Sequence, residues 1–246
     1  MDCGVVRTGL HDSVLDQVGM LVVSGAFAAG DVLLIEQLEA RFEVSRSVIR
    51  EAIRVLESMG LVMSRRRVGV TVLPRTRWNV YDPRVVRWRL SGEDREAQLR
   101  SLGGLRRGVE PVAAALAADR ATPEQCGELM RTVMDMAVHA KSGDLTAFLQ
   151  ADIAFHSIVL EASDNEMLRA LAPLVAEVLT GRTQHDLMPA HPNPVAVRLH
   201  GDVAQAIGGG DVAAAEAAMR DIIDEATKAM LTGGGGAAGT RRPSGR

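Results

Sequence analysis

The chain has few aromatic residues and few cysteines. Phe, Trp and Tyr make up 3% of its 246 residues, so its core must be built mainly from aliphatic side chains, which favours helical packing over a β-sandwich. The two cysteines, Cys3 and Cys126, are far apart and lack metal-type spacing. This excludes a disulfide framework and predicts a reducing, cytoplasmic setting.

Long apolar runs are also missing. No run approaches the roughly 20 residues that cross a bilayer. The N-terminus mixes Asp, Arg and His with apolar residues, unlike a signal peptide. We therefore expect a protein without a membrane partner.

The chain as a whole has no excess of positive charge, but one segment has. The net charge is −3, yet residues 35–77 contain nine arginines and five glutamates, a local excess of +4. The remainder is therefore acidic. This asymmetry predicts one domain that faces DNA and one that does not.

The segment that begins at Ser45 has the pattern of a DNA-recognition helix. Ser45, Arg46 and Ser47 form a short polar start, and Arg50 and Arg54 continue the exposed face of Arg46 in steps of four. A guanidinium can donate two hydrogen bonds to one guanine, at O6 and at N7, so we expect Arg46 and Arg50 to recognise bases. We expect Ser45 and Ser47 to contact phosphate or base edges near the helix start. The opposite, apolar face should be buried and comprises Val48, Ala52, Val55, Leu56 and Met59.

The surrounding pattern predicts a winged helix-turn-helix. Helices are expected over residues 11–26 and 35–42 and from Ser45 to Gly60, followed by strands at 61–63 and 68–73. Three arginines lie at the tip between the strands, where they would contact the DNA backbone or the minor groove: Arg65, Arg66 and Arg67.

The rest of the chain predicts an all-α bundle, so the fold class is mainly α. Helices are expected near 83–90, 93–120, 123–142, 144–162, 164–187, 194–208 and 211–231. The predicted organisation is a flexible start (1–10), the winged domain (11–74), a linker (75–92), the bundle (93–232) and a Gly-rich, disordered tail (233–246).

Motifs along most of the chain resemble one family. In the first domain they are Val44-Ser45-Arg46, Val48, Arg50-Glu51-Ala52, Leu56, Gly60-Leu61-Val62, Arg67, Gly69 and Val72. In the second they are Arg106 to Glu110-Pro111, Ala117-Ala118, Asp152 to His156, Asn165, His200 and Gly210-Asp211. This set resembles the GntR superfamily of bacterial transcription regulators, in its FadR-type branch with an FCD effector domain. The linker, with Arg75, Trp78-Asn79, Asp82 and Trp88, is similar to that of the galactonate-responsive repressors.

The resemblance implies a metal site in the bundle. Asp152, His156 and His200 match metal ligands of FCD domains, for which Zn²⁺, Ni²⁺ or Mn²⁺ would suit the mixed N/O set. The usual fourth ligand, a histidine, is replaced by Ile222, which cannot coordinate a metal. Two interpretations stay open: the three residues hold an ion, or they bind the effector directly without one.

The resemblance also implies a small anionic effector. Arg106 would clamp its carboxylate, although Arg106 and Glu110 could instead form a simple helix-surface pair, and Arg182 would add a second contact. The implied function is a homodimeric repressor on a palindromic operator of a sugar-acid operon, released by a galactonate-like carboxylate. The alternatives are a regulator of another carboxylate pathway and a metal-dependent helical-bundle enzyme. One departure from the family is Glu36, which stands where some members carry a basic DNA contact.

Overall fold

The computed structural model describes residues 10–184 and 194–233, and side chains over slightly less. The chain divides into two compact units, Met1–Gln98 and Leu99–Arg246. Each unit is described by itself below.

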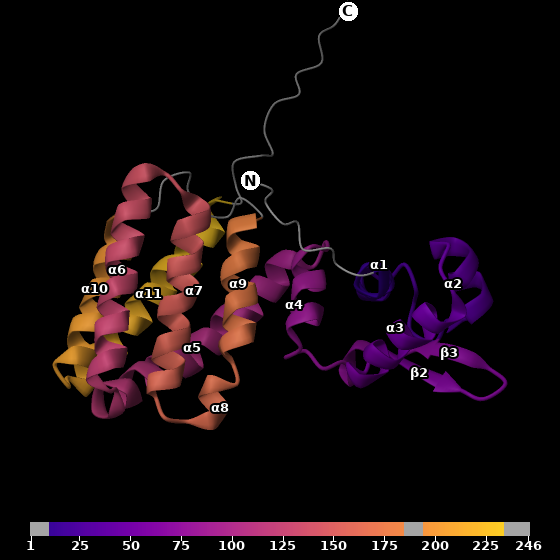
Figure 1. The fold of residues 1–246 in the computed structure, drawn as a ribbon, viewed down its shortest axis with the longest axis horizontal. Helices are drawn as coiled ribbons and strands as arrows, with labels where there is room; N and C mark the ends of the chain where they lie inside the picture. Colours follow the sequence, from indigo (N-terminus) through magenta and orange to yellow (C-terminus); the bar gives the residue numbers. More distant parts are fainter. Residues whose placement is uncertain (1–9, 185–193, 234–246) are drawn as a thin grey trace, which may run out of the picture. The chain divides into compact units, whose positions relative to one another are not determined.

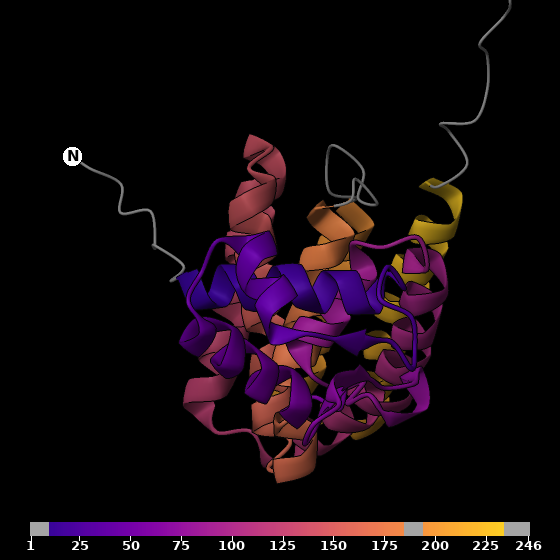
Figure 2. The ribbon, with the colours of Figure 1, turned by 90° about the vertical axis from the view of Figure 1, so that its right-hand side faces the viewer.

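The first unit is a small winged helical domain. Three helices precede a two-stranded hairpin, and a further helix follows it (Figures 1 and 2). This order confirms the predicted winged helix-turn-helix. Its elements are α1 (Leu10–Val23), β1 (Val32–Leu33), α2 (Ile35–Phe42), α3 (Arg46–Ser58), β2 (Val62–Arg65), β3 (Gly69–Val72), the 3-10 turn η1 (Arg75–Arg77) and α4 (Pro83–Leu90).

Helix α3 begins and ends as predicted, but its buried face is wider. Ser45 occupies the N-cap position with an extended backbone, yet its hydroxyl contacts Ser47 Oγ at 2.9 Å instead of a backbone amide. The fully buried residues include Ile49 and Ile53, which the prediction left out, while Val48 and Val55 are only half-buried. The predicted face was therefore wrong by part of a turn, because Ile49 and Ile53 lie at one edge of the apolar face and Val48 and Val55 at the other.

The sheet has three strands in the order β1-β3-β2, and both pairings are antiparallel. The predicted hairpin is present, with Val62 opposite Val72 and Arg65 opposite Gly69. Strand β1 was missed. It pairs Val32 with Thr71, so the segment before α2 adds an edge to the wing.

The segment expected as a linker, residues 75–92, folds onto the winged domain. Trp88 on α4 is 3% exposed, and its ring Nε1 donates to Asp16 Oδ1 of α1 at 3.0 Å. Its ring also fills the space that a side chain at Gly19 would need, since a Cβ there would lie 2.5 Å from it. Trp78 Nε1 donates to the carbonyl of Leu73 at 3.0 Å. Helix α4 is therefore held to α1 within the first unit.

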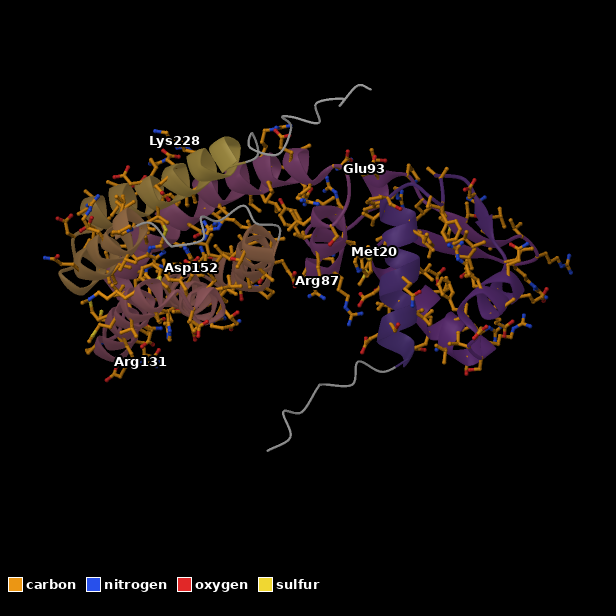
Figure 3. The ribbon with its side chains drawn as sticks, turned by 90° about the horizontal axis from the view of Figure 1, so that it is seen from above. Met20, Arg87, Glu93, Arg131, Asp152 and Lys228 are labelled. Carbon is orange, nitrogen blue, oxygen red and sulfur yellow. The ribbon has the colours of Figure 1, made fainter. Side chains whose placement is uncertain are left out.

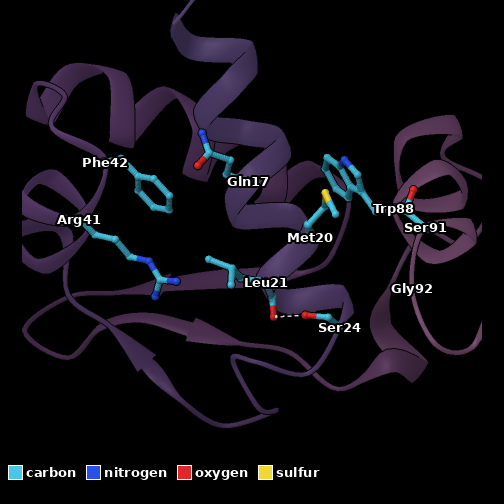
Figure 4. A pocket seen from close by; sticks show the side chains of 9 residues that line it. All are labelled: Gln17, Met20, Leu21, Ser24, Arg41, Phe42, Trp88, Ser91 and Gly92. Atoms are coloured by element: carbon cyan, nitrogen blue, oxygen red, sulfur yellow. Dashed lines mark hydrogen bonds between the residues drawn. The ribbon is translucent and has the colours of Figure 1, made fainter.

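A cavity of about 420 Å³ lies beside Trp88 in this unit (Figure 4). Met20 and Leu21 of α1 and Phe42 of α2 give it a largely apolar wall. Arg41 covers part of the rim, with its guanidinium carbon 5.8 Å from the centre of the Phe42 ring. Among the residues that line the cavity, Arg41 is the one cationic side chain, and no buried polar group there could pair with a bound anion.

The second unit is an all-α bundle, which confirms the predicted class. Helix α5 is its longest element and contains Pro111 (Figure 1). The single helix expected over 164–187 was wrong: it is two helices separated at Ala170-Leu171, and residues 185–187 lie outside the described part. The helices are α5 (Arg95–Arg120), α6 (Pro123–Ser142), α7 (Leu145–Ala162), α8 (Glu166–Arg169), α9 (Ala172–Gln184), α10 (Pro194–Gly208) and α11 (Val212–Gly233).

Helix α7 is the most apolar element of the bundle. Among the described residues, it alone has the length and hydropathy of a helix that could span a membrane. Half of its 18-residue window is buried against other helices, as in the central helix of a bundle, so this resemblance is weak evidence for a span. Phe155 and Leu160 on α7 are fully enclosed in the core.

Candidate functional site

The exposed face of α3 carries the residues predicted to read DNA. Ser45, Arg46, Ser47 and Arg50 are all exposed. Arg54 is exposed as well, and its Nη1 pairs with Glu51 Oε2 at 2.9 Å. The Arg46 and Arg50 side chains are therefore available to a groove, whereas Arg54 is partly neutralised.

The wing tip is a second basic surface. Arg65, Arg66 and Arg67 are exposed, and Arg67 turns the chain with a φ of 65°. Gly69 has a φ of 119°, and a Cβ there would come within 2.9 Å of Val32. Gly69, which the sequence also made a candidate DNA contact, is half-buried at the base of the wing, so the structure gives it a conformational reason for being glycine.

Glu36 of α2 lies beside this surface. Its Oε1 is 4.0 Å from Arg46 Nη1, and both side chains are well exposed. A carboxylate here repels phosphate, so the basic contact that some family members make from α2 is absent at this position.

The residues predicted for an effector or metal come together in the second unit. Six buried polar side chains form the cluster, and Figure 3 shows Asp152 inside the bundle. None is more than 7% exposed. Four helices contribute: Arg106 and Glu110 from α5, Asp152 and His156 from α7, Arg182 from α9, and His200 from α10.

Arg106 and Glu110 form a buried ion pair. Arg106 Nε donates to Glu110 Oε1 at 2.5 Å, and Arg106 Nη2 donates to Glu110 Oε2 at 3.2 Å. His156 Nδ1 lies 2.5 Å from Glu110 Oε2. The helix-surface pair considered from the sequence was wrong, because the pair is enclosed. The sequence also gave no sign of the contact with His156, which joins residues 46 positions apart.

Asp152 is the centre of the other half of the cluster. Its Oδ2 accepts from Arg182 Nη2 at 2.9 Å. Its Oδ1 lies 3.1 Å from His200 Nε2 and 3.4 Å from His156 Nε2. Arg106 Nη2 is 3.4 Å from His156 Nε2, so both arginines reach the same small volume.

Each of the two imidazole rings is fixed in its own orientation. His200 Nδ1 lies 2.7 Å from the carbonyl of Ala196, an acceptor that requires the proton to be on Nδ1. His156 Nδ1 lies close to Glu110 Oε2, although the geometry is not that of a hydrogen bond. Phe155 packs edge-on against both rings. Both Nε2 atoms face Asp152 Oδ1, so a proton or a cation must lie between each Nε2 atom and the carboxylate.

The electrostatics of the cluster favour charged carboxylates. Burial would raise the pKa of Glu110, but the charges of Arg106 and His156 lower it to about 2. Burial would also raise the pKa of Asp152, which hydrogen bonds from His156 and His200 and the charge of Arg182 hold well below its usual value. Burial would lower the pKa of His156, yet Glu110 and Asp152 raise it. The cluster thus retains positive charge beside two ionised carboxylates.

The donor set fits a metal ion with three protein ligands. The ligand atoms of Asp152, His156 and His200 lie within 4.8 Å of one another. Nδ1 contacts to Glu110 and to a backbone carbonyl are the outer-shell partners that metal-binding histidines use. Ile222 is buried and offers no donor, so the remaining coordination positions would be open. His185, which follows α9 in the sequence, lies outside the described residues.

Known families match both units. The sequence matches the family described as "FCD domain" over residues 102–225 and "Bacterial regulatory proteins, gntR family" over residues 10–72. Two relatives match most of the chain. The "Galactonate operon transcriptional repressor" of Escherichia coli K12 is 29% identical, over 89% of this chain and 96% of the relative. The "Putative L-lactate dehydrogenase operon regulatory protein" of the same strain is 31% identical, over 87% and 84%.

A solved structure has the same fold. Streptococcus agalactiae GntR superposes with a TM-score of 0.50 at 24% sequence identity, over 89% of this chain and 99% of that one.

Proposed function

Since the chain belongs to the GntR family of bacterial transcription regulators and carries an FCD domain, we propose that it represses a hydroxy- or sugar-acid operon and is released by that acid. The observation that carries the proposal is the buried cluster around Asp152. It joins two guanidinium groups to three potential ligand atoms in the domain that does not carry the recognition helix. Such a set of side chains would suit a small polyhydroxy anion.

The relatives support this class of effector. Galactonate and lactate, which their names contain, are both α-hydroxy carboxylates. The galactonate-like acid predicted from the sequence belongs to that class. The proposed cellular site is the cytoplasm, where the operator would be.

Arg182 is the side chain best placed to receive the carboxylate. Among the described residues no acceptor bonds its buried Nε, although its Nη2 already donates to Asp152. Arg106 has its Nε and one Nη2 hydrogen engaged by Glu110 and would contribute charge and its remaining donors. An incoming carboxylate would satisfy the spare donor and balance the two arginines.

A divalent ion would be held by Asp152, His156 and His200. When bound, it would supply a Lewis acid for the oxygen atoms of a hydroxy acid. Glu110 and the Ala196 carbonyl would keep both imidazoles turned toward it. In the metal-free alternative, the arginines alone would supply the positive charge.

Regulation would require two copies of the chain. One winged domain offers few base contacts, and two domains related by a twofold axis would read a palindromic operator. The effector releases DNA only if it binds the DNA-incompetent dimer more tightly.

We expect a hydroxy acid to release the protein from DNA. Intergenic DNA flanking the protein's own gene should bind in a gel-shift assay. D-galactonate or L-lactate should weaken that binding by roughly 5- to 150-fold, the usual range of allosteric coupling, while neutral D-galactose should not. Arg182→Gln should bind DNA normally and lose the response. Failure of every hydroxy acid to alter the affinity of the wild type would contradict the proposal.

We also expect the purified protein to hold about one divalent ion per chain, as measured by elemental analysis. His200→Ala should abolish the metal content and the drop in melting temperature that a chelator causes. His139→Ala, on α6 and outside the cluster, is the matched control and should change neither. Metal-free protein that responds fully to its effector in chelator would favour the alternative without an ion.

A further inference from the structure

A second cavity of the first unit lies where α4 ends and α5 begins. Its volume is about 470 Å³, within the range of small-ligand pockets. All of its lining residues belong to Met1–Gln98, and Ser24, Ser91 and Gly92 also line the cavity beside Trp88 (Figure 4). The two cavities differ in charge, because the second one is lined by three arginines: Arg75, Arg89 and Arg95.

Arg89 is the most enclosed of these arginines. The residue is 9% exposed. Within residues 10–184 and 194–233, its guanidinium has no hydrogen bond, ion pair or ring contact. The fully enclosed, unpaired side-chain atoms of the same ranges belong to Gln98, His156 and Arg182, so the Arg89 nitrogens keep some accessible surface, which opens into the cavity. A guanidinium that is nine-tenths buried without an acceptor requires a partner from outside the chain.

The other two arginines also keep unused donors. Arg95 Nε donates to the carbonyl of Leu90 at 2.8 Å, and its Nη groups bond nothing in the described part of the chain. Arg75 Nη1 donates to Asp94 Oδ2 at 2.8 Å, so Arg75 is partly neutralised. Glu93 is the one other charged residue of the lining and is exposed. Three arginines against two carboxylates leave the lining with a net charge of +1.

The uncharged donors that line the cavity are already engaged. The hydroxyls of Ser24 and Ser91 donate to main-chain carbonyls of their own helices, at 3.3 Å and 3.1 Å. Trp78 Nε1 donates to the carbonyl of Leu73 at 3.0 Å. The donors that remain are therefore guanidinium groups, which favour a ligand that only accepts hydrogen bonds and carries negative charge.

We propose that this cavity binds a small oxyanion, whose carboxylate or phosphate oxygens accept hydrogen bonds from Arg89 and Arg95. A guanidinium forms paired, parallel hydrogen bonds with either group. The site belongs to the winged unit and is separate from the Asp152 cluster, so it goes beyond the proposed effector site. Arg89 belongs to α4 and Arg95 is the first residue of α5, so the bound anion would join the two helices.

Tryptophan fluorescence tests binding in this unit alone. The two tryptophans of the chain, Trp78 and Trp88, both belong to the first unit, and Trp78 lines the cavity. Inorganic phosphate or acetate, titrated into the full-length protein, should change the emission saturably and beyond the effect of sodium chloride at equal ionic strength. A response to phosphate alone would identify a phosphate group as the ligand, and a response to acetate would identify a carboxylate. A wild type that responds to neither probe would overturn the proposal and leave water as the occupant.

Arg89→Met separates a binding role from a structural one. Methionine keeps an apolar stem and removes a charge that has no partner in the free protein. The variant should therefore melt at or above the wild-type temperature without either probe, as followed by tryptophan fluorescence. It should bind the probe at least about 10-fold more weakly, because a charged donor is lost. Arg77→Gln removes the same charge from an exposed residue of η1 outside the lining, and as the matched control it should change neither property.

Two results with Arg89→Met would overturn the proposal. One is an unchanged affinity for the probe. The other is a melting temperature lowered by the same amount with and without the probe, which is the signature of a purely structural guanidinium. If Arg89→Met does not fold, Arg89→Lys keeps the charge without the planar fork and should bind the probe about 3- to 10-fold more weakly at wild-type stability. Wild-type affinity in Arg89→Lys would then refute paired recognition by Arg89.

Discussion

Arg46→Ala and Arg50→Ala should each nearly abolish specific operator binding while leaving the fold intact. Both side chains are exposed on α3 and contribute nothing to its buried face. One bidentate contact with guanine contributes about 1–3 kcal/mol, and a dimer loses it twice, which predicts a loss of roughly 30- to 25,000-fold in affinity. Fluorescence anisotropy with the operator and with a scrambled duplex would measure the loss.

The control for these variants is Arg54→Ala on the same helix. Arg54 lies two turns further along and is paired with Glu51, so its role would be phosphate contact. That variant should weaken both duplexes equally and reduce the slope of log affinity against log salt by about one per copy. If Arg46→Ala and Arg50→Ala kept the wild-type sequence preference, α3 would not read bases through these residues.

Glu110→Gln should destabilise the second unit strongly at neutral pH. The carboxylate is 1% exposed, and its removal leaves the buried charge of Arg106 without its bidentate partner. Arg106 and His156 lower the pKa of Glu110 from 4.5 to about 2. That difference corresponds to about 3 kcal/mol of folding free energy. Urea unfolding at pH 7 would measure it.

The difference in unfolding free energy between the wild type and Glu110→Gln should depend on pH. Because the pKa of Glu110 is lower in the folded state, its stabilisation is fully present above about pH 4.5 and is lost as the pH falls toward 2. The gap between wild type and Glu110→Gln should therefore shrink as the pH falls below 4.5. Glu216→Gln removes a partner of Arg220 at the same i,i+4 spacing on the surface and should cost at most about 0.5 kcal/mol at any pH. A constant gap would show that Glu110 does not act through its charge.

Much of the fold followed from local sequence signals. The predicted ranges 35–42, 83–90, 123–142 and 194–208 coincide with helices. For the last three, Pro, Gly or capping residues stand at the ends, whereas α2 begins after Leu34 without a side-chain cap and ends at Glu43. Strand β1 was missed because two residues show no alternation, and its pairing with β3 is non-local. The break at Ala170-Leu171 was missed although Pro173, in the first turn of α9, is a local signal for a helix start.

The candidate site was predictable in its members but not in its connections. Asp152 and His156 share a helix face by spacing, whereas Arg182 and His200 entered through family resemblance, and the structure brings all four together. The contact of Glu110 with His156 was not foreseen, because it depends on how α5 packs against α7. The Arg-x-x-x-Glu spacing on α5 was the available signal, but it is also common on exposed helix surfaces.

Pro111 creates a point within α5 at which the helix can bend. Proline has no amide hydrogen, so the carbonyl of Arg107 lacks its helical donor, one turn from Arg106 and Glu110. A helix bends most cheaply at such a point. The arm from Arg95 to Glu110 is about 24 Å long at 1.5 Å per residue. If an anion shifted the Arg106 guanidinium enough to tilt this part of the helix by about 10°, the end at Arg95 would move by about 4 Å. Residues next to Pro111 would move much less.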